Sequence, residues 1–484
     1  MTEEFVDVLV VGAGLSGIGA GYHLQTLCPD RSYAIVEARP DLGGTWNLFR
    51  YPGVRSDSDM HTLGYSFRPW TDPKAIAEGP TILHYLRETA REYGIDRKIR
   101  FGHKVLRADW SSPDAQWTVQ VRREADGSTT LIRCALLFMC SGYYDYANGY
   151  QPAFPGQDRF GGRVVHPQQW PEDLDYAGRR VVVIGSGATA VTLVPALAAK
   201  AAHVTMLQRS PTWMVARPSV DPIGSRLRQR LPLRLALLLT RWKNVLLTMY
   251  VFWLCKRSPR RMRALLLGGV RQALGPKADI ATNFTPRYNP WEQRLCLVPD
   301  GDFFQAINQG RASVVTDHIE SFTETGLKLR SGATLDADII VSATGLKLAM
   351  LGNTELHVDG QRVAPSRAVN YKGLMYSGVP NMANTFGYTN ASWTLKADLT
   401  AQYVCRLLNH MRKTGARQCL APAAGPDTPL LPWVDFSSGY FQRAADQLPK
   451  QGTTRPWKLN QNYLSDLVAL RFGAIDDGVL QFSR

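Results

Sequence analysis

The chain of 484 residues lacks the paired cysteines that would indicate a zinc site, a redox-active disulfide or a disulfide framework. Its seven cysteines are scattered without a C-x-x-C pair or a Cys/His cluster, and none lies between positions 28 and 134. A reducing, cytoplasmic setting is therefore expected, and no metal site is predicted. No basic segment precedes the first apolar run, so we expect no secretory signal peptide.

Acidic residues are nearly absent from one segment. Residues 223–280 hold thirteen Lys or Arg and a single acid, Asp279, so most of the net charge of +15 lies there. Leu231–Cys255 is very apolar, but its longest charge-free run, Asn244–Cys255, has twelve residues, whereas a spanning helix needs about twenty. We predict an inserted helical subdomain that either packs on the protein or makes a peripheral contact with anionic lipid. No nucleic-acid partner is expected, because no recognised module accompanies the basic residues.

A glycine-rich loop follows the first apolar run, Phe5–Val11, and a second apolar run, Tyr33–Val36, leads to Glu37. This acid lies twenty residues after the last glycine of the loop. A buried strand, a tight turn, a helix and an acid at this spacing are typical of a dinucleotide-binding unit, whose backbone N–H groups approach the pyrophosphate. The loop residues predicted to bind the nucleotide are Gly12, Gly14, Ser16 and Gly17.

A second unit of the same kind begins with the apolar run Arg180–Ile184. Its next strand, Val204–Leu207, is followed by Arg209 and Ser210 rather than by an acid. A cation and a hydroxyl suit the 2′-phosphate of NADPH, so NADPH is the predicted second nucleotide. The predicted loop contacts are Gly185, Ser186, Gly187, Ala188, Thr189 and Ala190. Two such units predict an α/β protein.

Two further motifs carry a family resemblance. The pattern F-x-G-x-x-x-H-x-x-x-W-P resembles the fingerprint of type I Baeyer–Villiger monooxygenases, in the flavin-containing monooxygenase superfamily. Its positions here are Phe160, Gly162, His166, Trp170 and Pro171. Gly43–Asp57 matches a second pattern of that family, G-G-x-W-x-x-x-x-[FY]-P-G-x-x-x-D. Asn283–Asp300 and Arg455–Tyr463 resemble the ethionamide-activating subgroup.

The resemblance implies two dinucleotide-binding, Rossmann-like domains. Residues 1–145 and 346–484 would form a discontinuous FAD domain. Residues 146–162 would form a linker, rich in Gly, Pro and Tyr. Residues 163–345 would form the NADP domain, with a helical insertion at about 220–285.

The resemblance also implies the reaction. An FAD- and NADPH-dependent monooxygenase would insert one oxygen atom of O2 beside a ketone carbonyl through a C4a-peroxyflavin, giving an ester or lactone, and would also oxidise sulfides. Arg294 would stabilise the peroxide anion and the negatively charged adduct, and Asp57 would orient Arg294. Gln293 stands where many relatives carry a Lys that grips the 2′-phosphate, so the strength of the NADPH preference is left open. The physiological substrate and the oligomeric state are also left open.

Further cofactor contacts are implied around the two loops. His166 and Trp170 would couple nucleotide binding to domain closure. Val105 would lie on a strand that runs past the adenine ring. The remaining predicted contacts are Gly44, Thr45, Trp46, Asn47, Arg55 and Asp57.

Three alternatives remain. The first is a monooxygenase that acts mainly on sulfur or nitrogen. The second is a reductase without oxygen insertion, which the absence of a Cys pair after the first loop disfavours. The third is a membrane-attached binding protein with a vestigial nucleotide fold, which intact Glu37, Asp57, Arg209 and Arg294 disfavour.

Overall fold

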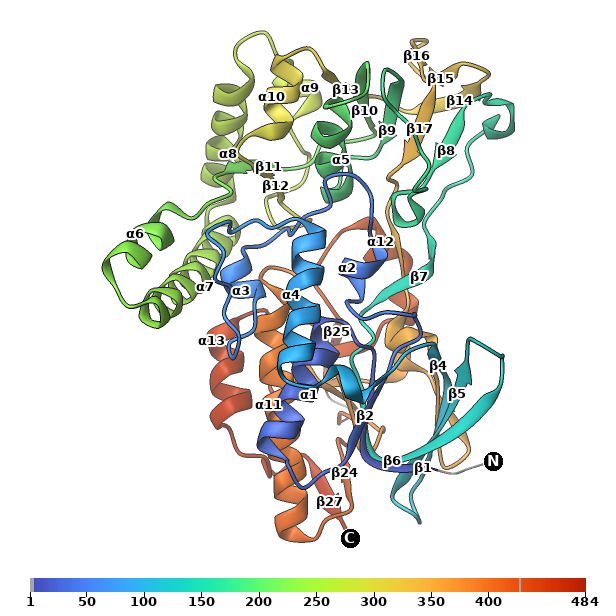
Figure 1. Ribbon diagram of the computed structural model, residues 1–484, viewed down its shortest axis with the longest axis vertical. Coiled ribbons are helices and arrows are strands. Elements are labelled where there is room, and N and C mark those ends of the chain that lie inside the picture. The colour runs from blue at the N-terminus through green and yellow to red at the C-terminus, as the bar shows by residue number, and fades with distance from the viewer. Residues whose placement is uncertain (1–3, 426–427) are drawn as a thin grey trace.

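A computed structural model describes residues 4–425 and 428–484. Residues 1–3 and 426–427, which fall in the ranges predicted for the FAD domain, lie outside the described residues. The chain forms two lobes (Figure 1). The first lobe, lower in the figure, contains both ends of the chain, and the second lobe is built from the middle of the sequence.

A nine-stranded mixed sheet organises the first lobe, in the order β20-β19-β4-β5-β6-β1-β2-β3, with β23 beside β6. β1 pairs in parallel with β2 on one side and β6 on the other. Its Val- and Leu-rich sequence suits a strand that is covered on both faces. The strands are β1 (Glu4–Val11), β2 (Tyr33–Val36), β3 (Ile99–Arg100), β4 (His103–Ser111), β5 (Gln116–Arg123), β6 (Thr129–Met139), β19 (Glu355–Val358), β20 (Gln361–Val363) and β23 (Met382–Asn384).

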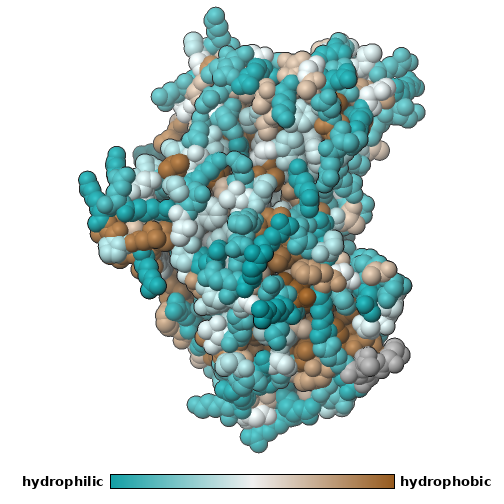
Figure 2. All heavy atoms as spheres, in the orientation of Figure 1, coloured by the Kyte–Doolittle hydropathy of each residue, from teal (hydrophilic) through white to brown (hydrophobic). Residues whose placement is uncertain are grey.

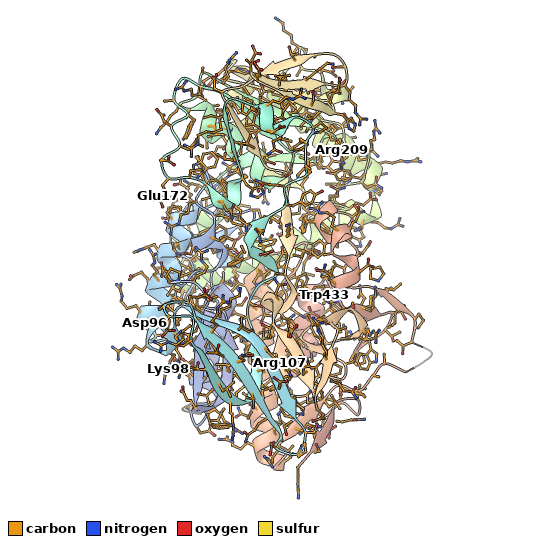
Figure 3. All side chains as sticks on the ribbon, turned by 90° about the vertical axis from the view of Figure 1, so that its right-hand side faces the viewer. Asp96, Lys98, Arg107, Glu172, Arg209 and Trp433 are labelled. Carbon is orange, nitrogen blue, oxygen red and sulfur yellow. The ribbon has the colours of Figure 1, made fainter. Side chains whose placement is uncertain are left out.

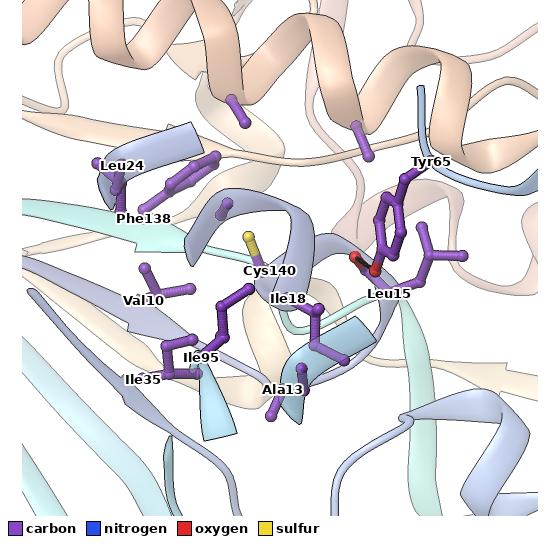
Figure 4. Packing of buried hydrophobic residues seen from close by; sticks show 14 of the residues in the cluster. Val10, Ala13, Leu15, Ile18, Leu24, Ile35, Tyr65, Ile95, Phe138 and Cys140 are labelled. Carbon is purple, nitrogen blue, oxygen red and sulfur yellow. Dashed lines mark hydrogen bonds between the residues drawn. The ribbon is translucent and has the colours of Figure 1, made fainter. Parts of the chain in front are cut away.

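Helices α1 (Leu15–Leu27), α4 (Gly79–Glu92) and α11 (Trp393–Thr414) pack together against this sheet. Figure 4 shows Ile18 and Leu24 of α1 beside Val10, Ile35 and Phe138 of the strands. Gly17 permits this packing, because a Cβ there would lie 1.8 Å from the carbonyl oxygen of Gly12. Only glycine therefore fits where α1 crosses the end of β1.

The second lobe contains a five-stranded parallel sheet in the order β13-β10-β9-β17-β8. A three-stranded antiparallel sheet, β14-β15-β16, lies beside it at the top of Figure 1. The strands are β8 (Arg163–Val165), β9 (Arg180–Ile184), β10 (His203–Gln208), β13 (Ala312–Thr316), β14 (Ile319–Thr323), β15 (Gly326–Leu329), β16 (Thr334–Asp336) and β17 (Ile339–Ser342). Helices α5 (Ala188–Ala198), α8 (Pro259–Leu274), α9 (Ile280–Asn283) and α10 (Asp302–Asn308) complete the lobe, as do β11 (Met214–Arg217) and β12 (Cys296–Pro299).

Two crossovers connect the lobes, and they pair with each other. β7 (Tyr144–Gly149) carries the chain up, and β18 (Leu346–Leu348) returns antiparallel to it. The stretch read from its composition as an irregular linker therefore begins as a strand. The glycine and tyrosine content suggested a loop, but the returning strand supplies hydrogen-bond partners that the local sequence does not reveal.

Residues 222–283 are mostly helical, and α6 (Pro222–Arg230) with α7 (Leu233–Arg257) extends from the side of the molecule in Figure 1. We predicted no membrane-spanning segment, yet α7 is the one helix in the described part of the chain that is long and apolar enough to cross a membrane, by length and composition alone. Its polar side chains bind the first lobe: Arg241 donates to the carbonyls of His61 (2.9 Å) and Gly64 (2.7 Å). In this structure α7 is therefore a helix docked on the protein.

The remaining elements are short. They include α2 (Thr45–Leu48), α3 (Met60–Leu63), α12 (Gly439–Arg443), α13 (Tyr463–Asp466) and a π-helical turn at Leu467–Phe472. The small strands are β21 (Asn370–Tyr371), β22 (Met375–Tyr376), β24 (Gln418–Leu420), β25 (Leu430–Pro432), β26 (Lys450–Gly452) and β27 (Gln481–Ser483).

Candidate active site

A cavity of about 710 Å³ lies between the lobes and contacts both glycine-rich loops. This volume is within the usual range for cofactor and small-molecule sites, about 300–1,000 Å³. The predicted residues on its wall are Gly12, Gly14, Ser16, Glu37, Gly44, Thr45, Trp46, Arg55, Asp57, Val105, Gly187, Ala188, Thr189 and Arg294. The predicted residues that lie off the wall are Gly17, Asn47, His166, Trp170, Gly185, Ser186, Ala190, Arg209 and Ser210.

The first loop presents bare backbone to the cavity. Gly12 has φ +104°, and a Cβ there would lie 2.7 Å from the carbonyl oxygen of Cys140. Gly14 caps α1 without any side-chain hydrogen bond. The first N–H groups of α1 therefore remain available to an anion, which the helix dipole also favours.

Glu37 directly follows β2 and is only 7% exposed. Its two oxygens accept hydrogen bonds from the backbone N–H of Ala13 (2.8 Å) and of Arg39 (2.9 Å). Burial raises the pKa of Glu37, although these backbone bonds oppose the rise. The side chain is thus fixed beside the first loop, with acceptor capacity left for a hydroxyl group.

The segment Gly43–Asp57 bridges the lobes. At its start, Gly44 (φ +54°) lies close against Gly14, since a Cβ at Gly44 would be 3.1 Å from the Cα of Gly14. Further along, Tyr51 and Val54 pack into the core of the second lobe. Arg55 forms an ion pair with Asp302 at the start of α10. Arg55 therefore faces the cavity while it is also bound to the second lobe.

Asp57 and Arg294 meet across the cavity wall. Arg294 Nη1 donates to Asp57 Oδ2 at 2.5 Å. The Asp57 side chain is 50% exposed and that of Arg294 is 33% exposed, because both face the cavity. The carboxylate raises the pKa of Arg294 still further above its usual range, so the guanidinium is a permanent cation. The structure thus places a fixed positive charge at the junction of the lobes.

The second loop repeats the construction of the first. Gly185 has φ +137°, and a Cβ there would lie 2.4 Å from the carbonyl oxygen of Ala343. Gly187 caps α5 without a side-chain hydrogen bond. Ser186 Oγ donates to the carbonyl of Ser210 at 2.9 Å, which ties this loop to the end of β10. Arg209 is exposed beside it, and finds no hydrogen-bond or ion-pair partner among the described residues; Figure 3 shows it in the upper lobe.

His166 and Trp170 lie at the crossovers. The His166 ring fills the space beside Gly149 of β7, where a Cβ would be 2.0 Å from its Cε1. Its Nε2 is 3.3 Å from the carbonyl oxygen of Gly345, just before β18, and burial lowers its pKa. Trp170 packs on the core of the second lobe. His166 therefore contacts both crossovers, Trp170 packs within the second lobe, and both side chains lie off the cavity wall.

An aromatic cluster lies on the cavity wall; family resemblance placed the stretch Asn381–Leu395, with Trp393, at the pocket, but sequence reasoning missed Tyr143, Tyr144 and Tyr440. Trp393 Nε1 donates to Ser16 Oγ at 2.8 Å, and its ring stacks on Tyr143 with centroids 5.2 Å apart. The hydroxyls of Tyr143 and Tyr144 are 2.8 Å apart. Arg294 lies near Tyr440 and Tyr144, and burial raises the pKa of both phenols. The available signal was the run Y-Y-D-Y at 143–146, which was interpreted only as part of a linker rich in Gly, Pro and Tyr.

Within residues 4–425 and 428–484, no group of three or more His, Cys, Asp or Glu is placed to hold a metal ion. All seven cysteines lie in that part of the chain, and they are free and buried. Fixed cations, backbone N–H groups and aromatic rings are the chemical groups that the cavity provides.

Comparisons with known proteins agree with this geometry. The sequence model of the family described as flavin-binding monooxygenase-like matches residues 7–261. The whole chain is 54% identical to the FAD-containing monooxygenase EthA of Mycobacterium tuberculosis, covering 99% of that protein. It is 48% identical over its whole length to the probable FAD-binding monooxygenase AlmA of Acinetobacter baylyi, covering 97% of it.

Solved structures share the fold. An oxidised steroid monooxygenase bound to NADP matches with a TM-score of 0.73 and 25% identity, over 87% of this chain and 88% of that chain. An open crystal structure of cyclohexanone monooxygenase matches with a TM-score of 0.74 and 20% identity, over 99% of this chain and 100% of that chain. These matches confirm the predicted fold class, an α/β protein with two Rossmann-like units.

Proposed function

The chain belongs to the flavin-binding monooxygenase-like family and is a flavoprotein monooxygenase, and from this premise we propose that it performs Baeyer–Villiger oxygenation with FAD and NADPH. A ketone would be converted to an ester or lactone, and sulfides would be oxidised at the same site. One observation carries the proposal: a single cavity is lined by both glycine-rich loops and by the Arg294–Asp57 pair. Both nucleotides and the reacting oxygen would meet there.

The first lobe suits FAD. The support is the bare backbone of Gly12 and Gly14, the uncapped start of α1 and the fixed carboxylate of Glu37. The pyrophosphate would lie on the N–H groups of α1, and Glu37 would accept from the adenosine ribose. The proposed FAD domain comprises residues 1–145 and 346–484.

The second lobe suits NADPH. The uncapped start of α5 would bind the pyrophosphate. Arg209 has no hydrogen-bond or ion-pair partner in the part of the chain that the structure describes, and it adjoins Ser210, so the two would supply a cation and a hydroxyl for the 2′-phosphate. The proposed NADP domain comprises residues 163–345, reached through the linker at 146–162.

Arg294 is the proposed catalytic residue. When bound and reduced by NADPH, FAD supplies the activation of O2 and its transfer to the substrate. Negative charge then builds on oxygen beside the substrate carbonyl, and the fixed guanidinium of Arg294 would stabilise it. Asp57 is the proposed positioning residue, because its carboxylate holds Arg294 at 2.5 Å.

The runner-up is a monooxygenase that acts mainly on sulfur or nitrogen with the same cofactors. The test is aerobic turnover of FAD-loaded protein with NADPH and a compound that contains both a ketone and a thioether. Mass spectrometry with ¹⁸O2 identifies the product. We expect an ester that contains one ¹⁸O atom; a sulfoxide alone would establish the runner-up, and NADPH oxidation without any oxygenated product would refute both.

We further propose a cytoplasmic protein whose α6–α8 region binds anionic membrane surfaces. α7 exposes a row of apolar side chains to solvent, among them Leu235, Leu238, Leu246, Tyr250 and Trp253. The α6–α8 region also exposes basic residues at Arg226, Arg230, Arg234, Arg257, Arg260 and Arg261. Figure 2 shows hydrophobic and hydrophilic residues side by side on this protruding edge. Apolar area next to cations is the arrangement of helices that lie in a membrane interface.

A further inference from the structure

The C-terminal turn, residues Tyr463–Phe472, directs its carboxylate toward the protein. It consists of α13 and the π-helical turn that follows it. Asp466, the only acid in the turn, is 3% exposed. Its Oδ2 accepts hydrogen bonds from Lys396 Nζ and from the Tyr388 hydroxyl, both at 2.8 Å. The inner side of the turn therefore carries its negative charge.

The outer side of the C-terminal turn is apolar. Leu464 is 37% exposed, Val468 is 59% exposed and Phe472 is 69% exposed. These side chains are four residues apart, so they lie on one face. A helix that faces water normally shows the opposite arrangement, with apolar side chains inside and polar ones outside. The inversion indicates an apolar partner on the outer face.

The fold fixes the C-terminal turn in this orientation. Arg406 of α11 donates to the carbonyl oxygens of Leu470 (2.6 Å) and Gly473 (2.7 Å). Leu470 lies on the inner side and is only 1% exposed. Rotating the turn to bury Phe472 would break these bonds and would leave Lys396 as an unpaired buried cation. The exposed apolar face is therefore a stable feature of the molecule.

Helix α7 is inverted in the same way. Its polar side chains face the first lobe: Asn244 is 6% exposed and donates to Asp59 at 2.9 Å, and Arg241 donates to the carbonyls already described. The row of apolar side chains described for α7 faces solvent. Two elements on this side of the molecule thus bind the protein through polar groups and expose apolar ones.

The two apolar faces lie side by side. Trp242 of α7 packs against Tyr463 of the C-terminal turn, with ring centroids 6.1 Å apart. Leu238 and Leu246 are both exposed and lie about one helical turn before and after Trp242, and Leu464 directly follows Tyr463. Figure 1 shows α13 below α7 on the same side of the molecule. Together the two faces form a single apolar surface.

The charges on this surface indicate which partner it fits. Within α7 and the C-terminal turn, the exposed charged side chains are all cations: Arg234, Lys256, Arg257 and Arg471. The Arg471 guanidinium carbon lies 5.8 Å from the centroid of the Phe472 ring. A second copy of this surface would offer these cations no acid. Anionic lipid would pair its headgroups with them while its acyl chains covered the apolar side chains.

We propose that the C-terminal turn is a second membrane-contact element, which inserts Leu464, Val468 and Phe472 into the interface of an anionic bilayer beside α7. The inference rests on the membrane contact proposed for α6–α8 and adds to it a segment from near the end of the chain. Asp466, on the inner side of the turn, accepts from Tyr388 on the wall of the cavity between the lobes. The docked surface would therefore lie next to the reaction site.

Contact with lipid can be measured directly with a fluorescent label. The seven native cysteines are all buried, so a thiol introduced at an exposed position can be labelled selectively with an environment-sensitive NBD dye. The variants are Val468→Cys and Phe472→Cys in the full-length, FAD-loaded protein. The control is Phe101→Cys, at an exposed position between β3 and β4. The vesicles contain phosphatidylcholine with or without phosphatidylglycerol, and with or without nitroxide-labelled lipid.

On anionic vesicles, we expect the labels at 468 and 472 to emit at shorter wavelength and to be quenched by the nitroxide lipid, and the label at 101 to show neither change. The unlabelled double variant Val468→Ser/Phe472→Ser should bind anionic vesicles at least about tenfold more weakly than the parent, because it removes apolar area that lipid would cover. Phe101→Ser should bind like the parent.

The outcomes separate this inference from the proposal on which it rests. A parent that binds anionic vesicles without any spectral change or quenching at 468 and 472 would overturn the inference and leave the contact through α6–α8 in place. A parent that binds neither kind of vesicle would refute both. A parent that is dimeric in analytical ultracentrifugation, with a monomeric double serine variant, would show that a second copy covers the surface instead. If the double variant does not fold, the single labelled variants still decide the question.

Discussion

Replacing Arg294 by alanine should separate oxygenation from reduction of the flavin. The guanidinium is bound to Asp57 at 2.5 Å and faces the cavity. Hydride transfer from NADPH requires alignment of the two cofactors but creates no negative charge on oxygen. Oxygen transfer to a ketone would create such a charge, so we expect the fixed cation to matter most after the flavin is reduced.

Two effects set the expected magnitude for Arg294→Ala. Loss of one preorganised stabiliser of negative charge costs about 3–4 kcal/mol in the transition state, which is about a hundred- to a thousandfold in rate. In addition, Asp57 loses its counter-charge and becomes a free carboxylate on the cavity wall, where it repels the developing anion. The double variant Arg294→Ala/Asp57→Ala should therefore be faster than Arg294→Ala alone. Asp57→Ala alone should be mildly slowed, because it leaves the cation in place without its orienting partner.

Stopped-flow spectroscopy of FAD reduction and reoxidation, with product analysis on the same samples, provides the assay. We expect Arg294→Ala to retain FAD and to be reduced by NADPH, but to lose ketone oxygenation by at least about a hundredfold and to release hydrogen peroxide instead. Arg294→Lys keeps the charge and should recover part of the loss. An Arg294→Ala protein that forms ester as fast as the parent would show that another group stabilises the anion.

Further predictions concern the second nucleotide, the surface and the folded core. Arg209→Ala should weaken NADPH about ten- to a hundredfold and leave NADH nearly unchanged, because one charge-assisted bond to phosphate is worth about 1.5–3 kcal/mol; steady-state KM values test this. The protein should sediment with anionic vesicles in preference to neutral ones through residues 223–280, and less so at high salt. Asp466→Ala should lower the free energy of unfolding by about 3–5 kcal/mol in denaturant titrations, because it leaves Lys396, which is 1% exposed and 2.8 Å from Asp466, as an unpaired buried cation. Burial alone would raise the pKa of Asp398, but hydrogen bonds from His23 and Ser66 and nearby positive charge hold it below the usual value. A folded carboxyl with a lowered pKa contributes stability above its unfolded pKa of about 3.9, and this is lost as pH falls through the folded value; Asp398→Asn should flatten the acid side of the stability curve.

Each of these predictions has an outcome that contradicts it. Equal loss of NADPH and NADH would make Arg209 a structural residue. Sedimentation indifferent to lipid charge and salt would leave α6–α8 as a packed insertion. An unchanged unfolding midpoint for Asp466→Ala would mean that Lys396 reaches water or another partner, and an unchanged acid limb for Asp398→Asn would mean that its proton uptake is not linked to unfolding.

The sequence predicted the structure best where a short local pattern, a continuous apolar run, determines a buried strand. β2 and β9 have the predicted ends, and β1 begins one residue earlier than predicted. Short, continuous apolar runs allow few alternatives, and in β1 and β9 a glycine turn follows the run at once. The contact between Arg294 and Asp57, 237 positions apart, rested on family resemblance, because no local pattern encodes it. The strand β7 within the predicted linker was not foreseen for the same reason: its pairing partner β18 lies about two hundred positions later. The inverted C-terminal turn was not predicted either, since Lys396, which pairs with its buried Asp466, lies 70 positions earlier.

Several motif residues, on the cavity wall and off it, make contacts between the lobes. Within Gly43–Asp57, the glycines lie against the first loop, Tyr51 and Val54 enter the core of the second lobe, and the charged residues at the end pair with that lobe. His166 fixes the two crossovers to each other through Gly149 and Gly345. A reaction in which reduction must precede oxygen transfer needs two nucleotides held in a defined relation, and that relation is set by how the lobes meet. The sequence fingerprints of this chain therefore mark residues at the meeting of the lobes, and the charge that the proposed chemistry requires would come from Arg294, with Asp57 to hold it.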